Sequence, residues 1–437
     1  MELYESSIEL ATLLETNRVV YVRTEPEVLD FTDLVVSKIV IFGQGNSKVE
    51  LEISSSNAAQ VMGIIDATIF DKEMVDRVYF WDFKSLASFC KYHITKFVTP
   101  KNTVLDLKVI EYFLGNHKKP PENFLEAANR VGIIAQNKDW PAIYKSIHMP
   151  LMLRVLPSIE STALLNSELR RSEHPCYEIE GQVNGRLNCS KKFSKSYLPH
   201  NMSEQIKSNM KPKGYGLCFS TADFRFCEVV VLQWLSGDPK LKEIIDSGQD
   251  FHTRVYEMIT NMPCDTPVKR TISKRMFLPI MYGLGTTGLA KYLGVPEAVA
   301  DPLRHRVLKT FTTAVQWIEG YQERARHGET VKDYFGRPRK YKPEEAYLVR
   351  NFVVQAPAAT LCQEKLIDLW RAFDNTDNKI AYSVHDGFCV VFPLNNAKEV
   401  YTTMKDTLEA ESKLCQGLRM RVEIEFGDKL NAMRVVK

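Results

Sequence analysis

The chain has 437 residues, of which 44% are hydrophobic and 25% are charged. This balance is ordinary for a globular protein, and the length is sufficient for two or three domains. The formal net charge is only +3, so overall charge does not indicate nucleic-acid binding, and any basic surface must be local. Nine cysteines without a Cys-x2-Cys pair argue against a zinc site or a disulfide framework and indicate reduced thiols in a cytosol-like compartment.

The sequence pattern also argues against membrane insertion and export. The chain starts Met-Glu-Leu-Tyr-Glu, which is acidic and lacks the apolar core of a signal peptide. No apolar run approaches the roughly 18 residues that a membrane span needs. We therefore expect no leader and no membrane contact.

Residues 1–120 are predicted to form a small α/β domain, because short β-rich runs alternate with helical patterns. Such alternation is typical of a sheet covered by helices. The strand-like segments are residues 19–23, 38–42 and 48–53, and the helix-like segments are residues 82–93 and 104–114.

A basic segment follows residue 185. Seven cations stand between residues 186 and 213 against a single acid, Glu204. If such a segment binds a nucleic acid, contacts with phosphates dominate the affinity and weaken with salt. A solvated lysine-rich loop is the alternative, and the residues alone leave both open. The cations are Arg186, Lys191, Lys192, Lys195, Lys207, Lys211 and Lys213.

Two acidic residues stand at the ends of strand-like runs. Residues 216–222 are apolar and end at Asp223, ahead of a helix predicted over residues 229–236. A carboxylate at a strand end is held by the scaffold, which suits a metal ligand. Asp386 lies between two apolar runs, and a plain hairpin is its alternative interpretation, because Asp-Gly is a favoured turn pair.

The helix predicted over residues 269–283 carries four side chains at four-residue intervals on one face, over roughly 18 Å at 1.5 Å per residue. Two cations at one end can hold a polyphosphate, and the apolar and aromatic residues at the other end can stack on a flat ring. A solvated helix with a basic face is the alternative. Pro279 is expected to kink the helix near the carbonyl of Arg275. The four residues are Arg270, Lys274, Leu278 and Tyr282.

Taken in chain order, these segments resemble family A DNA polymerases, the bacterial DNA polymerase I type. The basic helix is similar to their Arg-x3-Lys-x3-(Phe or Tyr)-x3-Tyr-Gly pattern, with Leu278 in place of the aromatic residue and Pro279 in place of a glycine. Asp223 and Glu228 match Asp-x4-Glu, and Ser-Gly-Asp follows the next apolar helix. His385-Asp386 matches Val-His-Asp-(Glu), with Gly387 where an acid is common.

The resemblance covers about residues 147–437. It implies a helix over residues 147–166 that leads into the polymerase domain, and it includes shorter matches. Gly-x-Asp-x-His-Thr at residues 248–253 contains His252, and Gly-Arg-Leu at residues 185–187 contains Arg186. Residues 330–339 are similar to a Thr-x-x-Gly-Arg-x-Arg turn, and Asn351 and Gln355 fit an Asn-x3-Gln helix start. The order and intervals of these matches carry more weight than any single one.

The resemblance implies a template-directed DNA polymerase that extends a primer 3′-hydroxyl by two-metal nucleotidyl transfer with two Mg²⁺ ions. The implied metal ligands are Asp223, Asp386 and the backbone carbonyl of Phe224. The implied nucleotide contacts are Arg270, Lys274, Leu278, Tyr282 and His252, with Lys274 also protonating the leaving group and Glu228 excluding a 2′-hydroxyl. The implied DNA contacts are Arg186, Asn351, Gln355, His385, Lys191 and Lys192.

The resemblance also implies a multi-domain α/β fold, a right-hand polymerase with palm and fingers. The expected parts are an exonuclease-like α/β domain (residues 1–120), linker helices with a reduced thumb (121–184), the first part of the palm (185–237), the fingers (238–330) and the second part of the palm (331–437). The thumb is expected to be short because Gly185 lies only 19 positions after Asn166.

We expect no proofreading activity from the N-terminal domain. Residues 39–43 and 49–53 lack the Asp-x-Glu pair that opens the exonuclease pattern. Ser85 stands where a later metal-binding Asp belongs, and Asp106 is the only match to a ligand. One carboxylate does not hold two metal ions. An α/β module unrelated to exonucleases is the alternative.

The expected partners are primer–template DNA, dNTPs and a processivity or replisome partner, in the cytoplasm of a bacterium or of a phage-infected host. Two other functions remain open. An RNA polymerase or primase of the same superfamily is disfavoured by Glu228. A catalytically silent DNA-binding replication factor is disfavoured by the intact Asp223, Lys274 and Asp386.

Overall fold

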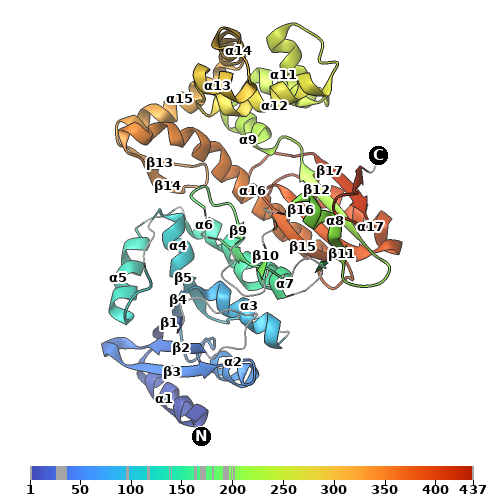
Figure 1. The fold of residues 1–437 in the computed structure, drawn as a ribbon. Coiled ribbons are helices and arrows are strands. Elements are labelled where there is room, and N and C mark those ends of the chain that lie inside the picture. Colours follow the sequence, from blue (N-terminus) through green and yellow to red (C-terminus); the bar gives the residue numbers. More distant parts are fainter. Residues whose placement is uncertain are drawn as a thin grey trace. The chain divides into compact units, whose positions relative to one another are not determined.

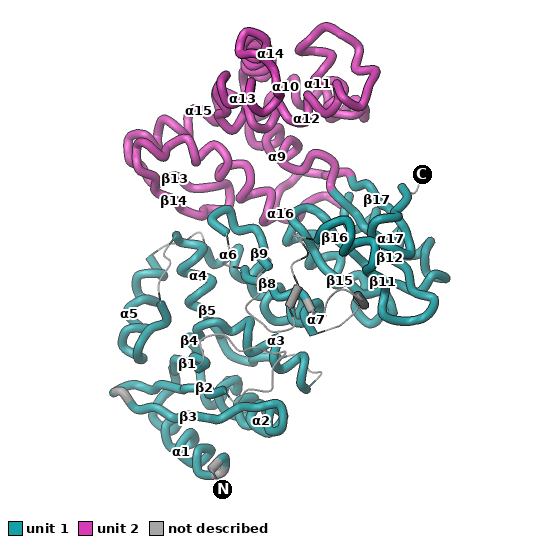
Figure 2. Tube along the Cα trace, in the orientation of Figure 1, with its two compact units in different colours: residues 1–223, 362–409, 422–437 teal, residues 224–361, 410–421 magenta. Residues whose placement is uncertain are grey.

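The computed structural model divides into two compact units (Figure 2). Unit 1 comprises residues 1–223, 362–409 and 422–437, and unit 2 comprises residues 224–361 and 410–421. The structure describes residues 2–25, 37–94, 98–115, 119–136, 138, 140–161, 165–167, 174–179, 182–189, 196–197, 199 and 202–435.

The N-terminal part of unit 1 is a five-stranded sheet with helices, as expected for an α/β domain (Figure 1). Its strand order is β3-β2-β1-β4-β5, in which β1 pairs antiparallel with β2 and parallel with β4. The strands are β1 (Val19–Glu25), β2 (Ser37–Phe42), β3 (Lys48–Ile53), β4 (Arg77–Trp81) and β5 (Thr103–Asp106). The helices are α1 (Glu2–Thr16), α2 (Ala58–Ala67), α3 (Phe83–Ile94) and α4 (Leu107–Phe113), with a 3-10 turn at Gln44–Asn46.

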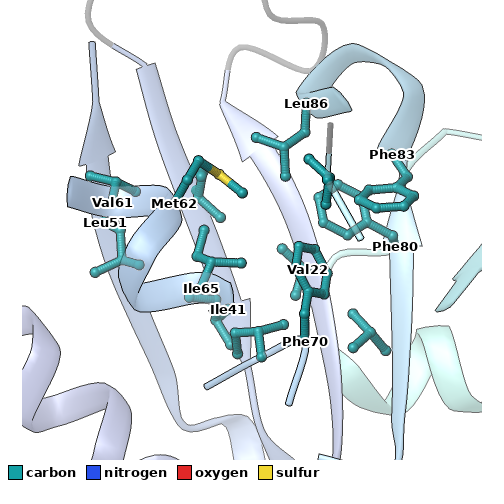
Figure 3. Packing of buried hydrophobic residues seen from close by; sticks show 14 of the residues in the cluster. Val22, Ile41, Leu51, Val61, Met62, Ile65, Phe70, Phe80, Phe83 and Leu86 are labelled. Carbon is teal, nitrogen blue, oxygen red and sulfur yellow. The ribbon is translucent and has the colours of Figure 1, made fainter. Parts of the chain in front are cut away.

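An apolar core lies between this sheet and α2. Val61, Met62 and Ile65 of α2 face the strand residues Leu51 and Ile41 (Figure 3). Burial of each such side chain contributes about 1.5–3 kcal/mol relative to exposure. Side chains that alternate between the two faces of each strand therefore give the sheet an apolar face that the helix can cover.

The helix predicted over residues 82–93 is confirmed as α3, but the helix predicted over residues 104–114 is wrong in its first turn. Val104 and Leu105 pair with β4 as part of strand β5, and the helix α4 begins only at Leu107. Pairing with a neighbouring strand decided the conformation of a segment whose apolar residues fit both periods.

The next segment is helical as far as Ser161. It contains α5 (Phe124–Ile134), α6 (Trp140–Ile143), π-helical turns at Tyr144–His148 and Leu151–Val155, and α7 (Leu156–Ser161). The helix predicted over residues 147–166 is therefore confirmed up to Ser161, whereas β6 (Leu165–Ser167) pairs with β11 (Met210–Pro212). Between Ser161 and Cys189 the described residues form short strands without a helix, and the reduced thumb stays a prediction. Besides β6, these strands are β7 (His174–Pro175), β8 (Tyr177–Glu178) and β9 (Asn188–Cys189).

A second five-stranded sheet in unit 1 has the order β15-β16-β12-β17-β18, and its predicted strands are confirmed. Phe219, Cys389 and Val391 are buried within it. Its strands are β12 (Leu217–Phe224), β15 (Lys379–Val384), β16 (Gly387–Pro393), β17 (Val422–Gly427) and β18 (Arg434–Val435). Accompanying elements are β10 (Ser196–Tyr197), α8 (Glu204–Asn209), a 3-10 turn at Leu394–Asn396 and α17 (Ala397–Glu409).

Unit 2 is mainly helical and packs around aromatic rings. Phe277 contacts Phe251 and Phe311 edge to face, with ring centroids 5.0 Å and 5.1 Å apart. Asp238 accepts backbone N–H bonds at the start of α10 and a further one from Ala314, which joins two helices. The elements are α9 (Cys227–Ser236), α10 (Pro239–Asp246), α11 (Phe251–Thr260), α12 (Pro267–Met281), α13 (Thr286–Leu293), α14 (Glu297–Thr310), α15 (Thr312–Arg326), β13 (Thr330–Lys332), β14 (Pro338–Lys340), a 3-10 segment Pro343–Leu348 and α16 (Val349–Phe373), which continues into unit 1.

The nine cysteines are free thiols in the structure. None of the described helices is long and apolar enough to cross a membrane.

Two buried acids of the N-terminal module, Asp82 and Asp106, are paired with groups of the same module. Asp106 is fully buried and accepts backbone N–H bonds from Phe83 (2.7 Å), Lys108 (3.0 Å) and Val109 (3.3 Å). Asp82 pairs with the Lys108 ammonium group at 3.0 Å. The one matched exonuclease ligand is therefore a helix cap, although the kinship of this module to exonucleases and its inactivity stay predictions.

We expect Asp106→Ala to lower the free energy of unfolding by about 2–4 kcal/mol, because three N–H groups lose their acceptor. Urea unfolding would measure this loss. Asp76→Ala is the control, because Asp76 lies on the surface in an ion pair with Arg18 and should cost less than about 1 kcal/mol. Equal losses in the two variants would contradict the assignment of Asp106 as a structural cap.

Candidate active site

Two predicted metal ligands meet at one end of the sheet in unit 1. Strands β12 and β16 run antiparallel, with Asp223 directly opposite Gly387. Asp386 precedes Gly387 in the tight turn between β15 and β16. The pairing of two segments that are far apart in sequence therefore places both carboxylates beside each other.

The surroundings of Asp223 are strongly acidic. Protein atoms packed around its carboxylate, together with the negative charges of Asp386, Glu425 and Glu423, raise the pKa of Asp223 to about 6. Sequence inspection missed these two glutamates, although their alternation along β17 is a signal that one strand face carries both. Such a gathering of like charges favours the binding of a cation.

The turn itself is strained and tightly fitted. His385 has a φ of 54°, in the left-handed region that non-glycine residues seldom adopt. A Cβ atom at Gly387 would lie 2.3 Å from Oδ1 of Asp223. Glycine in place of the family's acid thus has a physical reason, because a side chain there would displace the Asp223 carboxylate.

The donor set fits Mg²⁺, which prefers oxygen ligands and is commonly held by one or two carboxylates together with substrate phosphates. Asp223 and Asp386 supply such carboxylates. Within the part of the chain that the structure describes, no group of three or more His, Cys, Asp or Glu side chains forms a complete metal cage. Two carboxylates leave other coordination positions of such an ion for water or phosphate oxygens, and the role of the Phe224 carbonyl stays a prediction.

The basic helix of unit 2 is confirmed as α12, which is capped by the Thr266 side chain and begins at Pro267. Arg270 and Lys274 are exposed on one face, whereas Met276 lies buried on the other. The helix continues past Pro279 to its last residue, Met281, and the expected kink stays a prediction. The predicted stripe is thus an amphipathic face with its cations turned to solvent.

Arg270 is oriented by an acid that sequence inspection missed. Its Nε and Nη2 atoms donate to the two carboxylate oxygens of Asp250, at 3.0 Å and 2.7 Å. Asp250 also caps α11 by accepting from the backbone N–H of Thr253 at 2.9 Å. A bidentate pair of this kind fixes the plane of the guanidinium group.

His252 lies in the first turn of α11, and its side chain is buried. Its Nδ1 atom has no hydrogen-bond partner among the described residues. Burial and the charges of Arg270 and Lys274 lower the pKa of His252 to about 4, although Asp250 opposes them. The imidazole is therefore neutral at pH 7 and keeps one nitrogen for a ligand.

Two predicted residues of unit 2, Tyr282 and Gln355, contact a third, Glu228. The hydroxyl of Tyr282 donates to its carboxylate, and the side-chain amide of Gln355 lies 3.4 Å from both of its oxygens. Leu278, one turn before Tyr282 on α12, is half-buried against the same unit's core. The position of the Glu228 carboxylate is therefore held from α16 and from the C-terminal end of α12.

Of the remaining residues predicted to contact DNA, the structure describes only some. Asn351 is half-buried on α16, one turn before Gln355. Arg186 is half-buried and follows Gly185, whose carbonyl accepts from the Gln363 amide at 2.8 Å. Their roles in DNA binding stay predictions, as does that of His385. Lys191 and Lys192 lie outside the described residues.

The depressed pKa of His252 predicts a dependence of stability on pH. Its ordinary value is 6.5 and its folded value is about 4, so the folded chain binds fewer protons than the unfolded chain between these values. We expect the free energy of unfolding to fall as the pH drops from 6.5 towards 4, and His252→Gln to remove this contribution. Urea unfolding at several pH values would measure it, with His305→Gln as the matched loss of one imidazole. An unchanged pH profile in His252→Gln would contradict the assignment.

Comparisons with known proteins agree with the resemblance in sequence. DNA polymerase I from Thermus aquaticus is 26% identical over 215 residues, which cover 46% of this chain and 26% of that protein. DNA polymerase I from Borreliella burgdorferi is 25% identical over 241 residues, covering 51% of this chain and 26% of that protein. The chain therefore spans about a quarter of the length of these relatives.

A solved structure shows the same fold across almost the whole chain. The POL domain of Pol1 from M. smegmatis, in complex with DNA primer-template and dNTP, superposes with a TM-score of 0.75 at 14% identity, covering 99% of both chains. This likeness confirms the predicted fold class. The sequence model of DNA polymerase family A matches residues 155–432. With that match over more than half of its length, the chain belongs to DNA polymerase family A.

Proposed function

We propose that this protein is a template-directed DNA polymerase that adds deoxynucleotides to a primer 3′-hydroxyl. One observation supports this most: β12 and β16 bring the carboxylates of Asp223 and Asp386 together, on the two segments that match the family's catalytic patterns. The T. aquaticus and B. burgdorferi relatives are named DNA polymerase I, and the structural neighbour holds DNA primer-template and dNTP.

Asp223, Asp386 and the carbonyl of Phe224 would hold Mg²⁺, and two ions are proposed from family membership. When bound, such ions supply activation of the 3′-hydroxyl and neutralisation of the triphosphate and the leaving pyrophosphate. The carboxylates contribute fixed negative charge at a strand end, so no reorganisation of the sheet is needed when the cations arrive.

Arg270, Lys274 and His252 are proposed to hold the triphosphate. The ion pair with Asp250 orients the Arg270 guanidinium group. The planar N–H donors of such a group suit phosphate oxygens. Neutral His252 can donate one N–H without adding charge. Lys274 is proposed to protonate the leaving pyrophosphate as well.

Glu228 is proposed to exclude the 2′-hydroxyl of a ribonucleotide. Tyr282 and Gln355 hold its carboxylate, so it cannot swing aside at low cost. Leu278 would pack against the incoming base and sugar in place of the family's aromatic residue. These contacts favour deoxynucleotides over ribonucleotides.

Primer–template DNA is the proposed partner of Arg186, Asn351, Gln355, His385, Lys191 and Lys192. The carboxylates Asp82 and Asp106 of the N-terminal module are committed to a cation and to backbone groups, which supports synthesis without proofreading. A short thumb would make a processivity partner useful. The cytoplasm is the proposed compartment.

The activity is tested by primer extension on a recessed template with Mg²⁺, with dNTPs and rNTPs supplied separately. We expect extension with dNTPs, and its loss by at least about a thousandfold in Asp386→Ala, because the metal site loses one of two carboxylates. Glu228→Ala should retain binding of DNA and gain extension with rNTPs, because the obstacle to the 2′-hydroxyl is removed.

The control is Glu243→Ala, which removes an exposed acid of α10 whose ion pair with Lys240 lies on the surface. Tight binding of primer–template without any extension would replace the proposal by a catalytically silent DNA-binding factor. Equal extension with both nucleotide types by the intact chain would remove the assigned role of Glu228.

A second prediction concerns the turn beside Asp223. Gly387→Ala should weaken Mn²⁺ or Mg²⁺ binding about tenfold or more, because the added Cβ displaces the Asp223 carboxylate. Mn²⁺ titration followed by electron paramagnetic resonance would measure it. Gly63→Ala is the control, since open space surrounds that position, and equal affinity in both variants would show that Asp223 tolerates the methyl group.

A further inference from the structure

A buried tyrosine clamps the strand that leads into the Asp386 turn. Tyr177 belongs to β8, and its side chain is 1% exposed. Its hydroxyl donates to the carbonyl of Ser383 and accepts from the N–H of Ser383, both at 2.8 Å. One hydroxyl thus satisfies both backbone groups of one residue.

Tyr177 binds backbone groups of Ser383 at the edge of the described sheet. β15 is an edge strand of its sheet, so its outward backbone groups lack a neighbouring strand. Ser383 lies two residues before His385, and its own hydroxyl donates to the carbonyl of Gly387 at 3.2 Å. Tyr177 and Ser383 therefore fix both sides of the strained two-residue turn that carries Asp386.

The other end of the clamp reaches the N-terminal module through a buried carboxylate. Glu160 of α7 is fully buried and accepts from the backbone N–H of Tyr177 at 2.6 Å. It also accepts from the Ser88 hydroxyl and pairs with the Lys84 ammonium group, each at 2.5 Å. Both partners lie on α3.

These contacts form a continuous line within unit 1, from α3 through Glu160 and Tyr177 to the turn of Asp386. Breaking any of these buried contacts would leave a polar group without a partner, which costs free energy. Movement of these side chains relative to one another is therefore unfavourable. The side chain of Tyr177 itself meets neither nucleotide nor metal in the proposed reaction.

We propose that Tyr177 is a positioning residue for Asp386, and that Lys84 and Glu160 make the N-terminal module part of the support of the metal site. This inference rests on the proposed polymerase function. It gives the module a role in synthesis that is independent of exonuclease chemistry. Loss of the hydroxyl would let the turn shift, and a small displacement of a metal ligand lowers turnover more than substrate binding.

The chain contains a closely matched control. The hydroxyl of Tyr144 accepts from the N–H of Asp106 at 2.7 Å and donates to the carbonyl of Val104 at 3.3 Å. Tyr144 is buried in a π-helical turn and bridges backbone groups of a strand, as Tyr177 does, but that strand is β5 of the N-terminal sheet. Tyr144→Phe therefore reports the cost of losing such a bridge away from Asp386.

The experiment compares Tyr177→Phe with Tyr144→Phe in the full chain. Both should lower the midpoint of thermal unfolding. We expect Tyr177→Phe alone to reduce kcat about tenfold to a hundredfold and to raise the Mg²⁺ concentration at half-maximal rate, with KM for dNTP unchanged. Mn²⁺ titration without nucleotide should show weaker binding in Tyr177→Phe alone. Lys84→Met should also lower kcat and weaken Mn²⁺ binding, each to a smaller extent than Tyr177→Phe.

Equal kinetics and equal Mn²⁺ affinity in the two tyrosine variants would overturn the positioning role while leaving the polymerase function intact. A wild-type chain that extends no primer would instead refute the proposed function. In that case, the Mn²⁺ titration still decides whether Tyr177 supports the carboxylate site. If Tyr177→Phe failed to fold while Tyr144→Phe folded, Ser383→Ala, which loosens the same turn from its other side, should give the weaker Mn²⁺ binding, and wild-type affinity would overturn the inference.

Discussion

The antiparallel pairing of β12 with β16 is the constraint on which the proposed chemistry depends, because it holds like charges against their mutual repulsion. Asp223 and Asp386 are joined by two more acids on β17, and the pKa of Asp223 rises accordingly. A sheet held by buried residues such as Phe219 and Val391 can impose this arrangement. The left-handed backbone of His385 adds strain at the same place, as is common where function outweighs local stability.

Sequence patterns predicted the parts of the site that are local in the chain. The four-residue spacing from Arg270 to Tyr282 predicted one face of a helix, and strand patterns placed Asp223 and Asp386 at strand ends. Contacts between distant segments were beyond such patterns. Gln355 reaches Glu228 across 127 positions and Arg270 reaches Asp250 across 20. No periodicity encodes which partner a long side chain selects, since tertiary packing decides it.

Two predicted helix boundaries were wrong for a related reason. Val104 and Leu105 fit a helix as well as a strand, and their pairing with β4 selected the strand. The helix expected to reach residue 166 ends at Ser161, and Asn166 instead pairs with Lys211. In both cases a strand from elsewhere in the chain competed for the backbone hydrogen bonds. Propensity is a weak guide wherever such a partner is available.

Two buried acids, Asp106 of the N-terminal module and Glu160 of α7, are held by donors of the protein itself. A metal ion at Asp106 would compete with three backbone N–H groups for one buried carboxylate. Glu160 is likewise committed, to Lys84, Ser88 and Tyr177. Withdrawing either carboxylate would leave buried donors unsatisfied, at about 1–3 kcal/mol each. These acids hold helices to strands, which is the chemistry of a support, and the support extends to the strand that precedes Asp386.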